Sequence, residues 1–159
     1  MLVHARALLT STPEGSTAYI DADLRDPDSI LSSDELAALD LSKPVALTLM
    51  ATLHFVTDND AVHRILGRLM APLASGSALA LSVTTTDSAP EEVERGHASL
   101  RAQGIEVRPR NRAEVDEMFR GLRLLDPGVV LVHRWHPDDE ARALPDAHVH
   151  LYGGVALKP

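Results

Sequence analysis

The 159-residue sequence predicts an α/β fold, because apolar runs of strand length alternate with segments of helical periodicity. The clearest run is Val45 to Ala51, which is almost continuously apolar, as in a strand covered on both faces. The next segment, Asp60 to Leu73, has apolar residues at helical spacing, and Ser77 to Thr84 predicts a second buried strand. The length suits one domain and there is no internal repeat, so we expect a single domain over residues 1–159.

Weaker signals predict further elements on both sides of this strand–helix–strand unit. Before it, we expect a helix at Val3–Leu9, a strand at Thr17–Ala22, a helix from Pro27 or Asp28 through Leu31, and a second helical piece at Asp34–Leu39. After it, we expect a helix from Pro90 to Gln103, extended pieces at Ile105–Arg108 and Leu122–Leu125, a capped helix at Arg112–Arg120, a strand at Val129–Trp135, a polar loop at Pro137–Pro145 and a final strand at Ala147–Leu157.

The distribution of charge argues against nucleic acid as a partner. The net charge is −8, and residues 21–40 alone hold seven acidic residues against one arginine. A surface of this sign repels a phosphate backbone. One local basic cluster stands against it, and its pattern is typical of a solvated helix face and turn: Arg101, Arg108, Arg110 and Arg112.

Composition also bears on compartment. The sequence contains no cysteine, which excludes disulfides and thiolate chemistry and fits a reducing cytoplasm. No apolar run approaches the roughly 20 residues that a membrane span requires. We therefore expect a cytoplasmic protein with no membrane partner.

A candidate site follows the first buried strand. The strand leads to His54, and Thr57-Asp58-Asn59-Asp60 then supplies capping oxygens for the next helix. In open α/β sheets, ligands bind at the carboxyl ends of the strands. A histidine whose pKa lies near neutrality is a suitable general base, so His54 is our candidate catalytic residue. The alternative is a partly buried structural histidine.

Four further histidines raise the possibility of a zinc or nickel site near the end of the chain. They are His133, His136, His148 and His150. The second pair would share one face of a strand, but no cysteine and no helical His-Glu-x-x-His spacing accompanies them. Solvated histidines at the sheet rim are the alternative, and we assign no metal ligand.

Several segments resemble one known family. They are YIDADLRDP at Tyr19–Pro27, LMATLHFVTD at Leu49–Asp58, PGVVLVHRWH at Pro127–His136 and YGGVALKP at Tyr152–Pro159. Together they resemble the actinobacterial S-adenosylmethionine-dependent methyltransferase family that was formerly catalogued as a domain of unknown function. The resemblance covers essentially all of the chain.

The resemblance implies a Rossmann-like class I methyltransferase sheet, mostly parallel, with an antiparallel C-terminal hairpin. The segment Thr17–Ala22 would then be the third of its seven strands, and the two buried strands described above would be the fourth and fifth. The last two predicted strands would be the sixth and seventh.

The resemblance also implies a cofactor, S-adenosylmethionine, and a small-molecule methyl acceptor. Asp23 would bind the adenine amino group, and the main chain of Leu24 would face the adenine ring. The residues that close the fourth strand would line the methyl-donor pocket: Ala51, Thr52, Leu53 and His54.

The chain departs from the family pattern at its amino end. The first two strands, the Gly-rich turn and the acidic residue that would bind the ribose have no counterpart, so the chain resembles the C-terminal two-thirds of a methyltransferase. The fourth strand would expose an unpaired edge, and such an edge tends to find a partner. We expect either the third strand to move beside it or two chains to form a homodimer. The missing turn also supports a second hypothesis, a catalytically inactive oligomerising or binding module that does not bind the cofactor.

Overall fold

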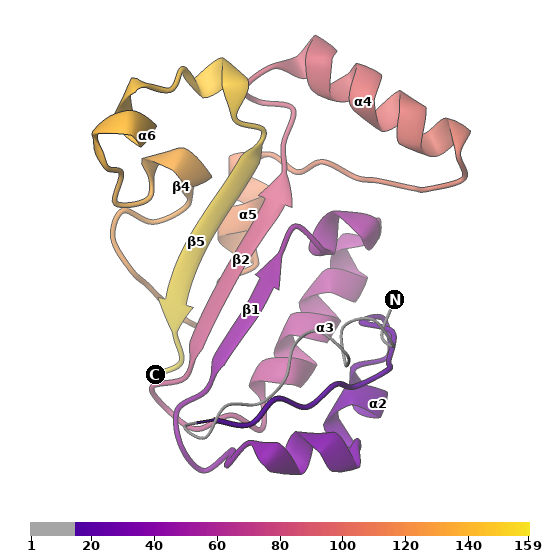
Figure 1. Ribbon diagram of the computed structural model, residues 1–159, viewed down its shortest axis with the longest axis vertical. Coiled ribbons are helices and arrows are strands. Elements are labelled where there is room, and N and C mark those ends of the chain that lie inside the picture. Colours follow the sequence, from indigo (N-terminus) through magenta and orange to yellow (C-terminus); the bar gives the residue numbers. More distant parts are fainter. Residues whose placement is uncertain (1–14) are drawn as a thin grey trace.

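The computed structural model describes residues 15–159, and its centre is a strand–helix–strand unit (Figure 1). Strand β1 (Ala46–Met50) pairs in parallel with β2 (Ala78–Thr84), and helix α3 (Asn59–Met70) connects them. This confirms the predicted α/β unit, with a helix that ends at Met70 instead of Leu73. The predicted helix Val3–Leu9 lies outside the described residues.

The rest of the sheet is antiparallel. Strand β5 (Leu151–Leu157) runs antiparallel to β2, and two short strands, β3 (Arg123–Leu124) and β4 (Val130–Leu131), pair with its other edge. The antiparallel C-terminal hairpin is therefore confirmed. A mostly parallel sheet is not: among the strands of residues 15–159, β1 and β2 form the single parallel pair, because the short β3 and β4 both pair with the reversed β5.

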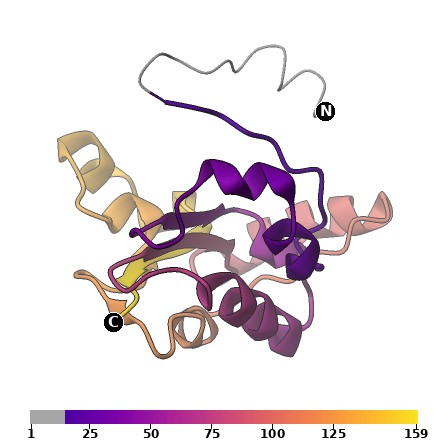
Figure 2. The ribbon, with the colours of Figure 1, turned by 90° about the horizontal axis from the view of Figure 1, so that it is seen from below.

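The predicted strand Thr17–Ala22 is wrong. The structure assigns no strand to these residues, which run as an irregular segment (Figure 2). Part of the segment lines a hollow with residues of the 3₁₀ helix η1 (Asp34–Ala38). Its alternating pattern favours β structure, but a strand also needs a neighbouring strand with which to form hydrogen bonds. The expected move of this segment beside β1 is therefore also wrong, and no strand of residues 15–159 pairs with the outer edge of β1.

The helices before and after the central unit mostly follow the predictions. Helix α2 (Pro27–Leu31) and η1 precede it, and α4 (Pro90–Ala102) and α5 (Arg112–Glu117) come after β2. The capping box predicted for α5 is present: the Asn111 side chain accepts from the Glu114 N–H, and the Glu114 carboxylate accepts from the Asn111 N–H.

Three predictions near the carboxyl end are wrong in part. The predicted strand Val129–Trp135 is only β4, followed by the 3₁₀ turn η3 (Val132–Arg134). The predicted polar loop contains a helix, α6 (Asp139–Ala143), because Asp138 caps it by accepting from the Ala141 N–H. The expected start of the last strand is a 3₁₀ turn, η4 (Asp146–His148).

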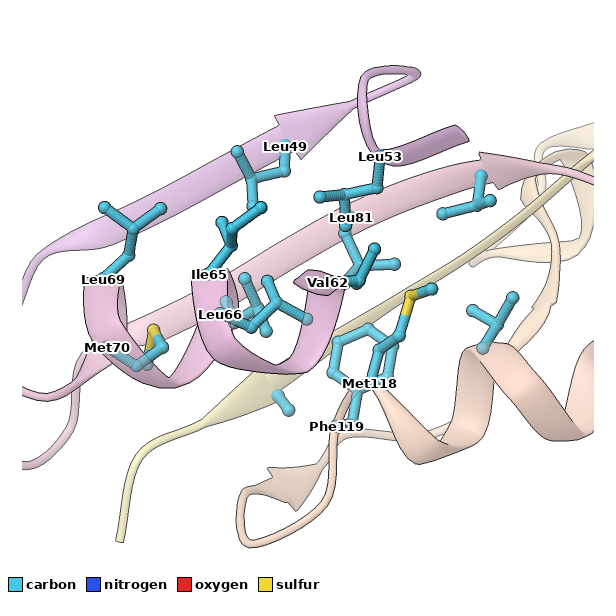
Figure 3. Packing of buried hydrophobic residues seen from close by; sticks show 14 of the residues in the cluster. Leu49, Leu53, Val62, Ile65, Leu66, Leu69, Met70, Leu81, Met118 and Phe119 are labelled. Atoms are coloured by element: carbon cyan, nitrogen blue, oxygen red, sulfur yellow. The ribbon is translucent and has the colours of Figure 1, made fainter. Parts of the chain in front are cut away.

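The hydrophobic core lies on one side of the sheet (Figure 3). Val62, Ile65, Leu66 and Leu69 line one face of α3 and are all buried. Residues of β1 and β2 face them, and Met118 and Phe119 complete the cluster from the segment after α5.

The other face of β1 is open. Ala46, Thr48 and Met50 alternate with the inward residues and are exposed, Met50 by 53%. The apolar run indicated a strand covered on both faces, but among residues 15–159 only one face is covered. Among the described helices, none is long and apolar enough to cross a membrane.

Candidate functional site

The chain turns sharply where β1 ends. Ala51 has a positive φ of 51°, and its N–H donates to both the main-chain oxygen and the Oγ of Ser82, at 3.1 and 3.0 Å. A left-handed conformation is costly for a residue with a Cβ, so these contacts hold the turn in place. Thr52 and the 3₁₀ turn η2 (Leu53–Phe55) follow at the carboxyl end of the parallel pair.

The residues of this turn differ in accessibility. Ala51 and Thr52 are exposed, whereas the Leu53 side chain is fully buried in the core. The Leu53 carbonyl is enclosed as well, because it accepts from the Val56 N–H at 3.1 Å and from Arg110 Nη1 at 3.0 Å. His54 is partly buried, and its ring lies against Phe55 with the centroids 4.4 Å apart.

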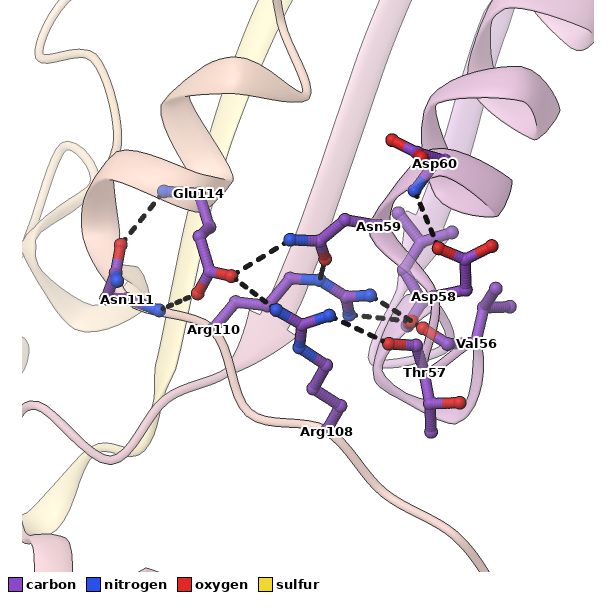
Figure 4. Close-up of polar contacts among 10 residues, drawn as sticks. Val56, Thr57, Asp58, Asn59, Asp60, Arg108, Arg110, Asn111 and Glu114 are labelled. Carbon is purple, nitrogen blue, oxygen red and sulfur yellow. Dashed lines mark hydrogen bonds and ion pairs between the residues drawn. The ribbon is translucent and has the colours of Figure 1, made fainter.

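The buried Arg110 is hydrogen-bonded to the η2 turn and the residues after it (Figure 4). The Arg110 guanidinium donates to the carbonyl oxygens of Leu53 (3.0 Å) and Val56 (2.6 Å) and to Asn59 Oδ1 (2.9 Å). Its side chain is 1% exposed, and this burial lowers its pKa. The prediction of a solvated basic cluster is therefore wrong for Arg110. Its guanidinium is buried and donates to main-chain carbonyls instead of to water.

A carboxylate extends this network to α5. Glu114 Oε1 accepts from Arg108 Nη2 at 2.8 Å and from Asn59 Nδ2 at 2.9 Å, and Arg108 Nη1 donates to the Thr57 carbonyl at 3.0 Å (Figure 4). Burial alone would raise the pKa of Glu114, but the hydrogen bonds from Asn59 and the Asn111 main chain, with the charge of Arg108, keep it below the ordinary value. The whole stretch from η2 to the start of α3 is thus fixed by residues 108–114.

A second histidine accompanies His54, and the sequence reasoning did not find it. His97 on α4 is 6% exposed, and its Nε2 lies 3.4 Å from Thr84 Oγ1 at the end of β2. Burial lowers the pKa of His54, and the charges of His97 and Arg110 lower it further; burial also lowers the pKa of His97. The Nδ1 atoms of both rings are buried without a hydrogen-bond partner in the part of the chain that the structure describes.

A signal in the sequence could have found His97. It lies one helical turn after Val93, and these two are the buried residues of α4. A histidine four residues from an apolar position shares its helix face.

The predicted adenine-binding residues, Asp23 and Leu24, lie just before α2 in the chain. Asp23 is exposed, and the Arg25 Nη2 and main-chain N–H donate to its carboxylate at 2.7 and 2.9 Å. The hydrogen bond from the Arg25 side chain lowers the pKa of Asp23 to about 2. Leu24 is partly buried and packs against the core.

An open groove of about 810 Å³ lies beside the candidate site. One wall consists of Arg25 and the start of α2, another of Phe55 to Asp58, and α3 forms the base. The six predicted site residues do not line it themselves; their chain neighbours Arg25 and Phe55 do. The Phe55 side chain is 47% exposed there, and an Arg68–Asp28 ion pair of 2.6 Å spans α3 and α2.

The C-terminal histidines have separate partners. His133 Nε2 lies 3.0 Å from Asp146 Oδ1, His136 Nε2 lies 3.1 Å from the Asp126 carbonyl, and His150 Nδ1 lies 3.2 Å from Ser88 Oγ. Within residues 15–159, no three potential ligands gather in a group that could hold a metal ion.

Comparisons with known proteins identify the family of this chain. A family model described as S-adenosyl methyltransferase matches residues 1–159. The chain is similar to the crystal structure of a DUF574 family protein from Streptomyces avermitilis, with a TM-score of 0.94, 49% identity, and coverage of 99% of this chain and 61% of that one. It is also similar to a putative methyltransferase from Thermobifida fusca, with a TM-score of 0.83, 29% identity, and coverage of 99% and 59%.

A more distant similarity concerns the fold alone. An O-methyltransferase family 2 protein from Planctomyces limnophilus matches with a TM-score of 0.50 and 17% identity, covering 76% of this chain and 33% of that one. None of the curated proteins gives a significant match. The chain spans about three fifths of the length of the Streptomyces and Thermobifida structures. From the family match over its whole length, the chain belongs to the S-adenosyl methyltransferase family.

Proposed function

We propose that this protein transfers a methyl group from S-adenosylmethionine to a small molecule at the carboxyl end of β1. The observation that carries the proposal is that His54, on the fixed η2 turn, lies next to Phe55, which opens onto the 810 Å³ groove. Membership of the S-adenosyl methyltransferase family supports the reaction.

The groove has features that suit the adenosyl part of the cofactor. The exposed ring of Phe55 offers contact to a flat base, and Arg25, which lines the groove, is hydrogen-bonded to Asp23. Asp23 would accept from the adenine amino group in exchange for Arg25, and the Leu24 main chain would lie against the ring. Ala51 and Thr52, both exposed, would border the methyl-donor end.

The chemistry asks little of the protein. When bound, the cofactor supplies a methyl group already activated by the positive sulfur. Alignment of the acceptor with that methyl carries most of the rate, so the main task of this chain is positioning. The Arg110 and Glu114 network suits this task because it fixes the turn that carries His54.

The first experiment is a calorimetric titration of this chain with S-adenosylhomocysteine. We expect binding in the micromolar range, weakened about tenfold or more by Asp23→Ala through loss of the acceptor for the adenine amino group. Asp40→Ala is the matched control, since Asp40 is an exposed, ion-paired carboxylate that does not line the groove. Absence of heat up to millimolar ligand would contradict the proposal for this chain and leave the alternative of an inactive oligomerising or binding module.

A further inference from the structure

Two imidazole nitrogens meet an unusual environment at the end of the parallel strand pair. The Nδ1 atoms of His54 and His97 are buried and have no hydrogen-bond partner among residues 15–159. Nearly all buried polar atoms of folded proteins are hydrogen-bonded, because an unpaired one keeps its desolvation cost. Such atoms therefore indicate a missing partner.

Both rings belong to the edge at which α/β sheets bind ligands. His54 follows β1, and His97 is held against Thr84, the last residue of β2, by the 3.4 Å contact of its Nε2 with Thr84 Oγ1. The carboxyl ends of adjacent parallel strands are the usual ligand position in this fold class. The missing partner thus lies where a substrate would be expected.

Helix α4 carries His97 and has few other buried residues. Of its thirteen residues, only Val93 and His97 are buried, and Figure 1 shows the helix standing away from the sheet at the end where β1 and β2 terminate. An element with so little buried surface opens at low cost. A displacement of α4 would move His97 with it.

The charges around the pair narrow the class of ligand. The two arginines that bind the segment after β1 are occupied: Arg110 donates to main-chain oxygens and Asn59, and Arg108 to Thr57 and Glu114. On α4, Glu94 and Arg101 act on His97 with opposite effects. Arg101, Arg108 and Arg110 already have partners, so a carboxylate would compete with those partners for them, whereas a hydroxyl can donate to one neutral imidazole and accept from the other.

We propose that His54 and His97 together bind the hydroxyl group of the methyl acceptor, with α4 as the cover that brings His97 to it. This inference rests on the proposed function and extends it to the class of acceptor, an alcohol or phenol. The acceptor oxygen forms its bond to the methyl carbon as the bond from that carbon to sulfur breaks, and sulfur keeps the electron pair. The hydroxyl proton passes to Nδ1 of His54, whose Nε2 carries the proton in the resting tautomer.

The test uses the histidine ring nitrogens as probes. In long-range ¹H–¹⁵N spectra of the full chain, millimolar phenol should shift the Nδ1 resonances of His54 and His97, while benzoate at equal concentration should not. His148→Gln, which alters an exposed histidine of η4, should leave the response unchanged. Shifts with benzoate but not phenol, or no shift with either, would overturn the proposal.

A second variant separates binding from a structural role. His97→Leu should weaken phenol binding at least tenfold with little change in the melting temperature, because removal of the unpaired buried Nδ1 offsets the lost contact of Nε2 with Thr84 Oγ1. A large fall in melting temperature with phenol binding retained would assign His97 a structural role and overturn the inference.

The two proposals fail independently. Binding of S-adenosylhomocysteine without any effect of phenol on the two rings would contradict the proposed hydroxyl site but support the proposed methyltransferase function. The opposite result, a response to phenol without cofactor binding, would support the hydroxyl site but contradict the proposed methyl transfer by this chain.

Discussion

At the scale of single residues, Arg110 is the side chain that decides most about the site. Its guanidinium donates hydrogen bonds to the carbonyls of Leu53 and Val56 and to the Asn59 side chain, and only 1% of the residue is exposed. Charge-assisted hydrogen bonds of this kind are stronger than neutral ones. The turn that carries His54 therefore depends on a residue 56 positions away in sequence, a separation that follows from their numbers.

Replacing Arg110 should destabilise the protein. Arg110→Met keeps the apolar stem but removes the donor to the Val56 carbonyl and Asn59 Oδ1 and one of two donors to the Leu53 carbonyl, so we expect a loss of about 2–4 kcal/mol in the free energy of unfolding. Urea unfolding followed by circular dichroism measures this. Arg120→Met is the control, because Arg120 forms an exposed ion pair with Glu117 and should cost less than about 1 kcal/mol. Equal losses in the two variants would contradict the role given to Arg110.

The two histidines should make stability depend on pH. The pKa values of His54 and His97 lie below 6.5 in the folded state, chiefly through burial, so the unfolded chain binds protons first as pH falls. The sign is therefore a stability that is complete above about pH 6.5 and decreases below it.

Urea unfolding at pH 7.5 and 5.5 tests this dependence. The difference between the two pH values should shrink in His54→Gln, His97→Gln and, most of all, the double variant. An unchanged difference in the double variant would assign the pH dependence to other groups. His63→Gln serves as the control, because His63 is exposed on α3.

At the scale of elements, α3 and α4 contrast in how they are held. Five residues of α3 are buried, against two of the longer α4. Helix α3 packs across β1 and β2, whereas α4 stands away from the sheet (Figure 1). Local opening free energies follow such differences in buried apolar contact.

Hydrogen exchange should separate these two helices. We expect the main-chain amides of α4 to exchange well before those of α3, and ligands that bridge His54 and His97 to slow α4 selectively. Mass spectrometry of peptides covering residues 90–102 and 59–70 measures both rates. Equal protection of the two helices would argue against α4 as a movable cover.

At the scale of the whole molecule, the outer edge of β1 remains open. Among residues 15–159 no strand pairs with it, and Thr48 and Met50 are exposed beside it. Exposed edges of this kind form pairs with other strands. We propose that two copies of the chain form a homodimer through this edge.

A substitution on one edge can test the dimer without disturbing β2. The Val45 carbonyl and the Ala51 N–H bond to β2, so alternation directs the N–H of even-numbered residues such as Thr48 to the open edge. Thr48→Pro removes this donor, and proline is tolerated on edge strands. Light scattering should show dimers for the parent chain and for Thr48→Val, and monomers for Thr48→Pro. A monomeric parent chain would rule out the homodimer.

The sequence predicted those parts of the fold that depend on neighbouring residues. The alternation of β1, α3 and β2, the Asn111 capping box and the position of His54 after a strand all follow from local periodicity and capping chemistry. The segment Thr17–Ala22 and the loop 137–145 failed for the converse reason. Strand formation in the first needed a neighbour, and Asp138 in the second began a helix that composition alone did not indicate.

By itself, the sequence determined the α/β class, the main elements and the family resemblance, because these are properties of residues close together along the chain. The tertiary structure alone decided that Arg110 is buried behind η2, that His97 meets Thr84 near His54, and that one face and one edge of β1 stay open. These features join residues tens of positions apart. Their physical reason is that burial and hydrogen-bond satisfaction are settled only when distant segments pack together.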